Sequence, residues 1–451
     1  MVKIDLYNSQ SQITCTSQEE YDTCSYILSY FVEGSKFAGN PFWDGRIRLL
    51  KKGWFPTGLS SRLIQKLEKQ GIEHSVSDLR VEPATNCQEL PMIAGIDYRP
   101  YQKDIIDITK KKHRGIIVLG TGGGKSITLG GIIADKQIPT LVITPDTGLR
   151  EQLSETLKFM FGEKKIGLDI REDKPIIVSN IQALTNKPSN LFERFKMLMT
   201  DEFHHSGADS YRTVNDYCKN SFFRYGFTGT PTRSSGDLMN MVGVLSKIIF
   251  KKSTSELIKE GWLVRPNITI HSYDLAQPRM NYKRAYSFLT LESGVNKIIA
   301  TIANFKISQN KQTLVLVRHK AHGRLLKDLI PDSIYLSGDD KEDYREKMKK
   351  LFIDKKIPCL IATSIFGEGT DIPSIDVLIN GRFEKTEIQT KQGVGRALRL
   401  AEGKTEAEVF DFIVTGNKHT QNHSVERLNS YRSEPEFNIS IKKFNHEDYS
   451  I

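Results

Sequence analysis

Residues Gly115–Ser126 read GIIVLGTGGGKS, and this stretch decides the fold because it joins an apolar run to a polar segment through consecutive glycines. The β-branched residues before Leu119 are typical of a parallel strand that is buried on both faces. A helix is expected to begin near Lys125. Glycines between the two elements leave the backbone open to close approach, because they carry no side chain. The stretch therefore predicts a strand–turn–helix unit of a parallel α/β sheet.

The glycine turn also has the chemistry of a phosphate site. Successive backbone N–H groups at a helix N-terminus can surround a phosphate chain, Lys125 can supply positive charge, and Ser126 can bind Mg²⁺. The strict signature has glycine where Leu119 stands, and a glycine turn without a nucleotide is the alternative interpretation. We predict ATP and Mg²⁺ as ligands. The predicted nucleotide contacts in this stretch are Gly120, Thr121, Gly122, Gly123, Gly124, Lys125 and Ser126.

Length and composition limit the class of protein. The 451 residues suffice for about three domains, and the formal net charge of +10 would attract a polyanion. No apolar run approaches the roughly twenty residues of a membrane span, and the polar start is unlike a signal peptide, so we expect a cytoplasmic protein. The five cysteines include no C-x-x-C pair, which favours reduced thiols and argues against a structural zinc site.

Residues 1–91 lack strand–helix alternation and are predicted to form a separate small α+β domain. A helix is expected from Gln18 to Phe31, and a second one from Ser60 or Ser61 to a point before Gly71. Between them, Asp-Gly at residues 44–45 predicts a hairpin.

This hairpin concentrates aromatic and basic side chains. Rings can stack on exposed bases while cations contact a nucleic-acid backbone, so we predict DNA contacts at Trp43, Arg46 and Arg48. A place in the core is an equally good interpretation of Trp43, and for Trp54 it is the preferred one.

From Tyr98 onward, apolar strands alternate with amphipathic helices, which predicts parallel sheets. We expect two tandem α/β domains, over residues 92–264 and 265–416, and a polar tail over residues 417–451. Gln102 opens a helix just before the phosphate loop, where its amide can read the adenine edge.

Polar residues follow several strands of the first α/β domain, at the edge where parallel sheets bind ligands. Thr144, Arg150 and Ser179 are the predicted DNA-backbone contacts there. The strand KMLMT leads into DEFHH, in which Asp201 is expected to hold Mg²⁺ through water and Glu202 to activate the attacking water. A zinc site that uses the two histidines is the alternative, but further ligands are not evident.

The second α/β domain places basic and polar residues at the corresponding strand ends. Arg318 and Thr363 are predicted DNA contacts, and Gly369 and Asp371 are predicted to contact the nucleotide.

The last cluster, TKQGVGRALRL, contains Gln392, Arg396 and Arg399, and its two arginines are expected at i and i+3 on one helical face. Together they could neutralise the charge that develops during phosphoryl transfer.

In this order, the motifs TGGGKS, DEFH, FTGTP and QGVGRALR resemble those of the superfamily 2 DExH helicases over roughly residues 98–415. The resemblance implies two RecA-like domains and an ATPase in which Lys125, Ser126, Asp201, Glu202, Arg396 and Arg399 have the roles given above. FTGTP stands in place of the family's Ser-Ala-Thr or Thr-Ala-Thr turn.

Within the small domain, FVEGSKFAGNPFWDGRIRLL and WFPTGL resemble the UvsW-like phage recombination helicases over about forty residues. This resemblance implies ATP-driven remodelling of branched DNA by a motor that we expect to be monomeric. Three alternatives stay open: an RNA helicase or duplex translocase, a restriction-type motor subunit, and a nucleic-acid-binding module without catalysis.

Overall fold

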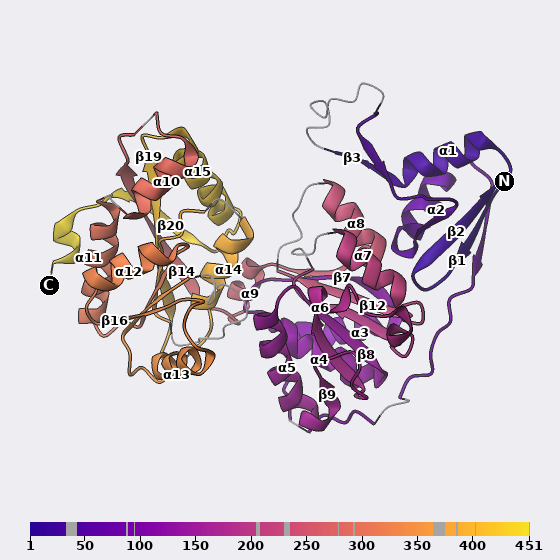
Figure 1. Cartoon of the computed structure of the whole chain (residues 1–451), viewed down its shortest axis with the longest axis horizontal. Helices are drawn as coiled ribbons and strands as arrows, with labels where there is room; N and C mark the ends of the chain where they lie inside the picture. The colour runs from indigo at the N-terminus through magenta and orange to yellow at the C-terminus, as the bar shows by residue number, and fades with distance from the viewer. Residues whose placement is uncertain are drawn as a thin grey trace. The chain divides into compact units, whose positions relative to one another are not determined.

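The computed structural model describes residues 1–32, 43–86, 89–93, 95–203, 208–229, 235–277, 279–291, 294–363, 375–384, 387–401 and 403–450, with the backbone alone at residues 208, 235–238, 387–389 and 392. The chain divides into two compact units (Figure 1). The first unit contains Met1–Leu119 and Gly124–Lys251, and the second contains Gly120–Gly123 and Lys252–Ile451. Within the described residues, no helix combines the length and apolar composition that a membrane crossing requires.

A seven-stranded sheet with helices around it forms the body of the first unit, and its registered strand pairs are all parallel, as predicted. The strand order is β13-β7-β12-β11-β8-β10-β9. The strands are β7 (Arg114–Leu119), β8 (Thr140–Thr144), β9 (Ile166–Gly167), β10 (Ile176–Asn180), β11 (Met197–Thr200), β12 (Phe223–Thr228) and β13 (Ile248–Lys252). The helices are α3 (Pro100–Lys111), α4 (Lys125–Lys136), α5 (Thr147–Phe161), α6 (Ile181–Leu184), α7 (Ala208–Tyr217) and α8 (Ser235–Leu245).

The small domain belongs to the first unit. Its four-stranded sheet has the order β5-β2-β1-β6, and a separate hairpin pairs β3 with β4. The elements are β1 (Val2–Leu6), β2 (Gln10–Cys15), α1 (Gln18–Ile27), β3 (Ser29–Phe31), β4 (Arg46–Arg48), β5 (Trp54–Pro56), η2 (Thr57–Leu59), α2 (Ser60–Lys69) and β6 (His74–Asp78). Helix α2 occupies the predicted range, with Leu59 rather than a serine at the N-cap position.

Three predictions for the small domain were wrong. Helix α1 ends at Ile27 instead of Phe31, because Ser29–Phe31 leaves the helix to pair with β4. The tight two-residue turn lies at Lys52–Gly53, between the paired residues Lys51 and Trp54, and not at residues 44–45. Trp54 is 41% exposed, because β5 is an edge strand on which the neighbouring Phe55 takes the core position.

Helix α8 completes the core of the small domain. Met239 belongs to the same apolar cluster as the buried residues of β1, α1 and α2, and Asn240 Nδ2 donates to Tyr30 Oη at 3.1 Å. Gly58 lies so close to α8 that a Cβ atom there would be 2.1 Å from the Val242 carbonyl oxygen. The small domain is therefore packed directly onto the first α/β sheet.

The second unit contains another seven-stranded parallel sheet, in the order β16-β17-β15-β18-β19-β14-β20. The strands are β14 (Arg265–Asp274), β15 (Thr313–Leu316), β16 (Ser333–Leu336), β17 (Cys359–Ala362), β18 (Val377–Asn380), β19 (Glu406–Thr415) and β20 (Asn438–Lys443). The helices are α9 (Thr254–Lys259), α10 (Tyr282–Leu291), α11 (Val295–Ser308), α12 (Lys320–Leu329), α13 (Glu342–Ile353), α14 (Glu387–Ala397) and α15 (Lys418–Arg432).

Residues beyond 417, expected as a polar tail, add α15 and the edge strand β20 to the second unit. Arg427 of α15 donates from Nε to buried Asp411 of β19 at 3.1 Å, and Tyr431 Oη donates to the same carboxylate at 2.6 Å. The free energy of burying Asp411 is thus offset by charged and neutral donors from this helix.

Candidate active site and DNA-contact surface

The phosphate loop has the geometry that its glycines predict. Strand β7 ends at Leu119, and α4 begins at Lys125 behind Gly124, whose φ of 76° lies in the left-handed region. A Cβ atom on Gly124 would also lie 2.6 Å from the Gln102 amide nitrogen. The left-handed backbone therefore favours glycine at residue 124, and a side chain there would also have to displace the end of the Gln102 side chain.

Two buried carboxylates follow strand β11, and Lys125 contacts one of them. Asp201 and Glu202 are 5% and 6% exposed, and Lys125 Nζ donates to Glu202 Oε1 at 2.5 Å. Glu202 has a φ of 44°, which is uncommon for a residue with a side chain, and its N–H donates to Asp201 Oδ1 at 3.0 Å. The phosphate-loop lysine and the acidic pair thus form one cluster.

Burial raises the pKa of one acid of this cluster, Asp201. Desolvation, helped by the charge of Glu202, raises the pKa of Asp201 to about 6, while Lys125 acts in the opposite direction. A divalent cation beside Asp201 would favour its ionised form, so the cluster has the donor chemistry that Mg²⁺ requires. Ser126, the other predicted Mg²⁺ ligand, lies in the first turn of α4 and is partly exposed.

Gln102 contacts the phosphate loop. Its side chain is 3% exposed, Nε2 donates to the Gly124 carbonyl oxygen at 3.3 Å, and Oε1 accepts from Arg99 N–H at 2.9 Å. Gly120, Thr121, Gly122 and Gly123 form the turn itself, with Gly123 N–H donating to the Gly120 carbonyl oxygen at 3.0 Å. An adenine contact by Gln102 stays a prediction.

Some predicted site residues fall outside the described structure. These are Gly369, Asp371, the histidines of DEFHH and the side chain of Gln392. Of FTGTP, the described part shows Thr228 at the end of β12, in register with Val118 of β7.

The arginine cluster differs from the prediction in one respect. Arg396 lies in the last turn of α14 and is 6% exposed, but the helix ends at Ala397, so Arg399 is not on the same helical face. Lys404 Nζ donates to the Ala397 carbonyl oxygen at 2.6 Å, and Val264 N–H donates to the Leu398 carbonyl oxygen at 2.8 Å. These two hydrogen bonds satisfy carbonyl groups at the C-terminal end of the helix.

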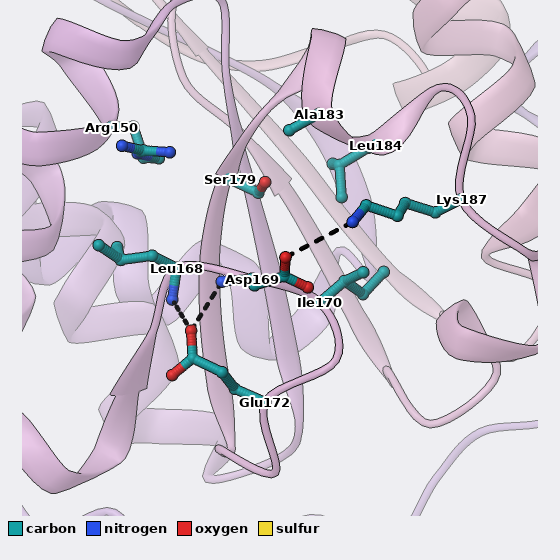
Figure 2. Close-up of a pocket in the computed structure, with 9 residues that line it drawn as sticks. All are labelled: Arg150, Leu168, Asp169, Ile170, Glu172, Ser179, Ala183, Leu184 and Lys187. Atoms are coloured by element: carbon teal, nitrogen blue, oxygen red, sulfur yellow. Dashed lines mark hydrogen bonds and ion pairs between the residues drawn. The ribbon is translucent and has the colours of Figure 1, made fainter.

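The DNA contacts predicted at the first sheet gather in part around one pocket, with a volume of about 210 Å³. Figure 2 shows Arg150 of α5 on one side and Lys187, which follows α6, on the other, with Ser179 of β10 between them. Thr144 is not among the lining residues, and its buried hydroxyl donates to the Asp146 carbonyl oxygen at 3.0 Å. The lining residues are Arg150, Leu168, Asp169, Ile170, Glu172, Ser179, Ala183, Leu184 and Lys187.

Lys187 and Asp169 were not predicted from the sequence; Lys187 Nζ and Asp169 Oδ2 lie 3.5 Å apart in this pocket. Both lie in irregular segments, where no periodicity marks a side chain as facing a cavity. The one sequence signal that could have indicated Lys187 is its position shortly after strand β10 of the sheet.

The three residues near the hairpin β3–β4 that were predicted to contact DNA interact with neighbouring residues. Trp43 Nε1 donates to the Arg46 carbonyl oxygen at 2.9 Å, and the Arg46 guanidinium carbon lies 4.3 Å from the centroid of the Tyr26 ring. Arg48 forms an ion pair with Asp44 at 2.6 Å, which lowers the pKa of this carboxyl. These side chains therefore lie together on one hairpin.

In the second unit, Arg318 and Thr363 follow strands β15 and β17. Arg318 is half-exposed, and its Nε lies 3.0 Å from Glu384 Oε1. Thr363 is buried, and its N–H donates to the Leu336 carbonyl oxygen at 3.3 Å. Arg318 is thus the more accessible of the two candidates.

Two family models match the chain. They are "Type III restriction enzyme, res subunit" over residues 95–233 and "Helicase conserved C-terminal domain" over residues 294–401. The two matches cover most of the α/β part of each unit.

The chain also resembles phage proteins over nearly its whole length. It is 25% identical to "ATP-dependent DNA helicase uvsW" of Enterobacteria phage T4, covering 98% of this chain and 99% of that protein. It is 26% identical to "Probable helicase D10" of Escherichia phage T5, covering 88% of each. Among solved structures, Dbp5 of Saccharomyces cerevisiae bound to RNA and ADP BeF3 superposes with a TM-score of 0.57 at 12% identity, covering 77% of this chain and 90% of that one.

Proposed function

Because the chain belongs to the superfamily 2 ATP-dependent helicases and is related to phage UvsW, we propose that it uses ATP hydrolysis to remodel branched DNA, such as four-way junctions and forks. The observation that carries an ATP-driven reaction is the cluster of Lys125, Glu202 and Asp201 at the phosphate loop. The similarity to the T4 helicase extends over the small domain. This similarity supports branched DNA, rather than a simple duplex, as the substrate.

In the proposed reaction, Lys125 changes partner when ATP binds. Its ammonium group contacts Glu202 at 2.5 Å in the structure, and a phosphate chain in the loop would compete for it. Glu202 would then be released to orient and deprotonate the attacking water. Arg396 and Arg399 are proposed to neutralise the charge that develops on the transferred phosphoryl group, and Gln392, Gly369 and Asp371 to support that site.

Ser126 and Asp201 would hold the metal ion. Mg²⁺, when bound, would shield the negative charge of the phosphate oxygens. The raised pKa of Asp201 fits this role, because a carboxylate that is buried without a cation is costly to ionise.

We propose that the DNA backbone is contacted at the carboxyl ends of the strands in the two sheets. The residues proposed to contact it are Arg150, Ser179, Thr144, Arg318 and Thr363. Backbone contacts position a motor without reading sequence. The hairpin residues Trp43, Arg46 and Arg48 would contact the branch point. We further propose a monomeric motor that acts in the cytoplasm of a host cell.

The test is ATP-dependent conversion of a synthetic four-way junction into forked products, beside a plain tailed duplex of the same length. Faster conversion of the junction, absent from Glu202→Gln, is the expected result. Equal or faster unwinding of the tailed duplex would contradict the specialised role. RNA that stimulates ATP hydrolysis more than DNA would favour the RNA-helicase alternative.

A further inference from the structure

Lys187 lines the pocket of Figure 2 and is not among the residues proposed above to contact DNA. It follows the short helix α6, and its backbone N–H donates to the Leu184 carbonyl oxygen at 3.1 Å, which fixes the start of the side chain. The Lys187 side chain is 25% exposed, so its ammonium group remains within reach of a ligand.

The ion pair between Lys187 and Asp169 is loose. Their charged atoms are 3.5 Å apart, whereas charge-assisted hydrogen bonds usually measure about 2.7–2.9 Å. Asp169 has closer partners in Arg171, whose backbone N–H and Nε donate to Oδ1 at 2.9 Å and whose second guanidinium nitrogen donates to Oδ2 at 2.7 Å. The Asp169 carboxylate would therefore stay neutralised if Lys187 moved away.

Arg150 lies on the other side of the pocket and forms a loose ion pair. Its terminal nitrogen is 3.2 Å from Glu151, and its buried Nε has no hydrogen-bond partner among the residues that the structure describes. Glu172, the second acid of the pocket, accepts from the N–H groups of Leu168 and Asp169 at 2.8 Å, so its charge is already used in the turn. The pocket is thus lined by two cationic side chains, Arg150 and Lys187. Its two carboxylates, Asp169 and Glu172, each accept hydrogen bonds from other groups.

We propose that Lys187 binds a backbone phosphate of the DNA in this pocket, which Arg150 also lines, and that Asp169 competes with this phosphate for Lys187. The inference rests on the proposed function, because it adds two residues to the same DNA path. A phosphate oxygen would bring the ammonium group a closer anion than the carboxylate at 3.5 Å. Asp169 would consequently weaken DNA binding in the natural protein.

The experiment measures the affinity of the full-length chain for a tailed DNA duplex by fluorescence anisotropy over a series of salt concentrations. Lys187→Ala is expected to weaken binding about fivefold to tenfold and to reduce the slope of log K against log salt by about 0.7–0.9, the value of one phosphate contact. Lys187→Arg keeps the positive charge and should restore the slope.

Asp169→Asn is expected to tighten binding about threefold to tenfold, because the competing charge is removed. Asp173→Asn is the matched control, since Asp173 lies in the same loop, is fully exposed and is 3.7 Å from Arg194 rather than Lys187. It should change the affinity less than about twofold. When Asp169→Asn is combined with Lys187→Ala, the gain should disappear, because Asp169 acts through Lys187.

Equal effects of Asp169→Asn and Asp173→Asn would overturn the role of Asp169. A salt slope unchanged in Lys187→Ala would overturn the phosphate contact, provided that thermal unfolding shows the variant to be folded. A natural chain that binds no DNA would contradict the proposed function itself, which separates the two failures.

Discussion

The two seven-stranded sheets share one architecture but carry opposite chemistry at their strand ends. In the first unit, the helix after β7 begins behind Gly124 in left-handed backbone, and the buried acids Asp201 and Glu202 follow β11. In the second unit, the helix after β15 begins behind His319, whose backbone is extended, with φ −104° and ψ 141°. Arginines take the place of acids there, because Arg318 follows β15 and Arg396 ends α14.

This difference supports the proposal that the functional residues lie in the loops after the strands rather than in the sheets. A glycine turn of left-handed backbone makes an anion-binding concavity, whereas an extended residue before a helix does not. We therefore propose that phosphate binding and water activation belong to the loop between β7 and α4 and to the acids after β11, and that arginines of the second unit neutralise charge. The following predictions test this division.

Removing the base of the first unit should have the largest effect. Glu202→Gln is expected to lower the ATPase rate by about 10³–10⁴, because the amide cannot accept a proton from water. Binding of ATP and DNA should remain, as measured by fluorescence titration. Glu193→Gln, at an exposed residue of the same unit, is the control and should leave the rate unchanged. Normal turnover in Glu202→Gln would remove this assignment.

Replacing an arginine of the second unit should have the next largest effect. Arg396→Lys keeps the charge but loses the planar guanidinium group, so kcat should fall about 10²-fold while ATP affinity changes little. Arg324→Lys, on the exposed face of α12, is the matched control. Equal rates in the two variants would show that the second unit does not contribute this charge.

The buried acid of the first unit should appear in the pH profile. The pKa of Asp201 is raised to about 6, so the residue takes up a proton at a higher pH than an ordinary aspartate and would lose its metal-binding form. At limiting Mg²⁺, kcat/KM should fall about tenfold for each pH unit below 6. An acid limb near pH 4 instead would mean that Asp201 titrates normally or has no role.

The smallest expected effect concerns the attachment of the small domain, which has no counterpart among the described residues of the second unit. Gly58→Ala places a methyl group 2.1 Å from the Val242 carbonyl oxygen and should lower the free energy of unfolding by about 1–3 kcal/mol. Gly95→Ala is the control, because nothing lies within 4 Å of a Cβ atom there. Calorimetry of the two variants would measure the difference, and equal melting temperatures would show that this packing is adaptable.

Local patterns were sufficient for much of the fold and of the nucleotide site. Alternating apolar strands and amphipathic helices predicted two parallel sheets, and the run GIIVLGTGGGKS predicted the strand, the glycine turn and the helix at Lys125. The acids at the end of KMLMT were correctly expected beside the loop, since carboxyl ends of parallel strands share one edge. These features depend on the period of side chains and on turn chemistry, which are encoded within a few residues.

Only the tertiary structure decided the features that depend on partners distant in the chain. Helix α14 ends before Arg399, and the Leu398 carbonyl oxygen just after it accepts from the N–H of Val264, more than a hundred residues earlier. Trp54 is exposed because β5 is a sheet edge. Strand β20 joins the second sheet by pairing with β14, and α15 is held to β19 by the ion pair between Arg427 and Asp411. The pair of Lys187 and Asp169 likewise arises when two irregular segments meet in one pocket. No local sequence pattern encodes such contacts between distant segments, because the packing of the whole unit determines them.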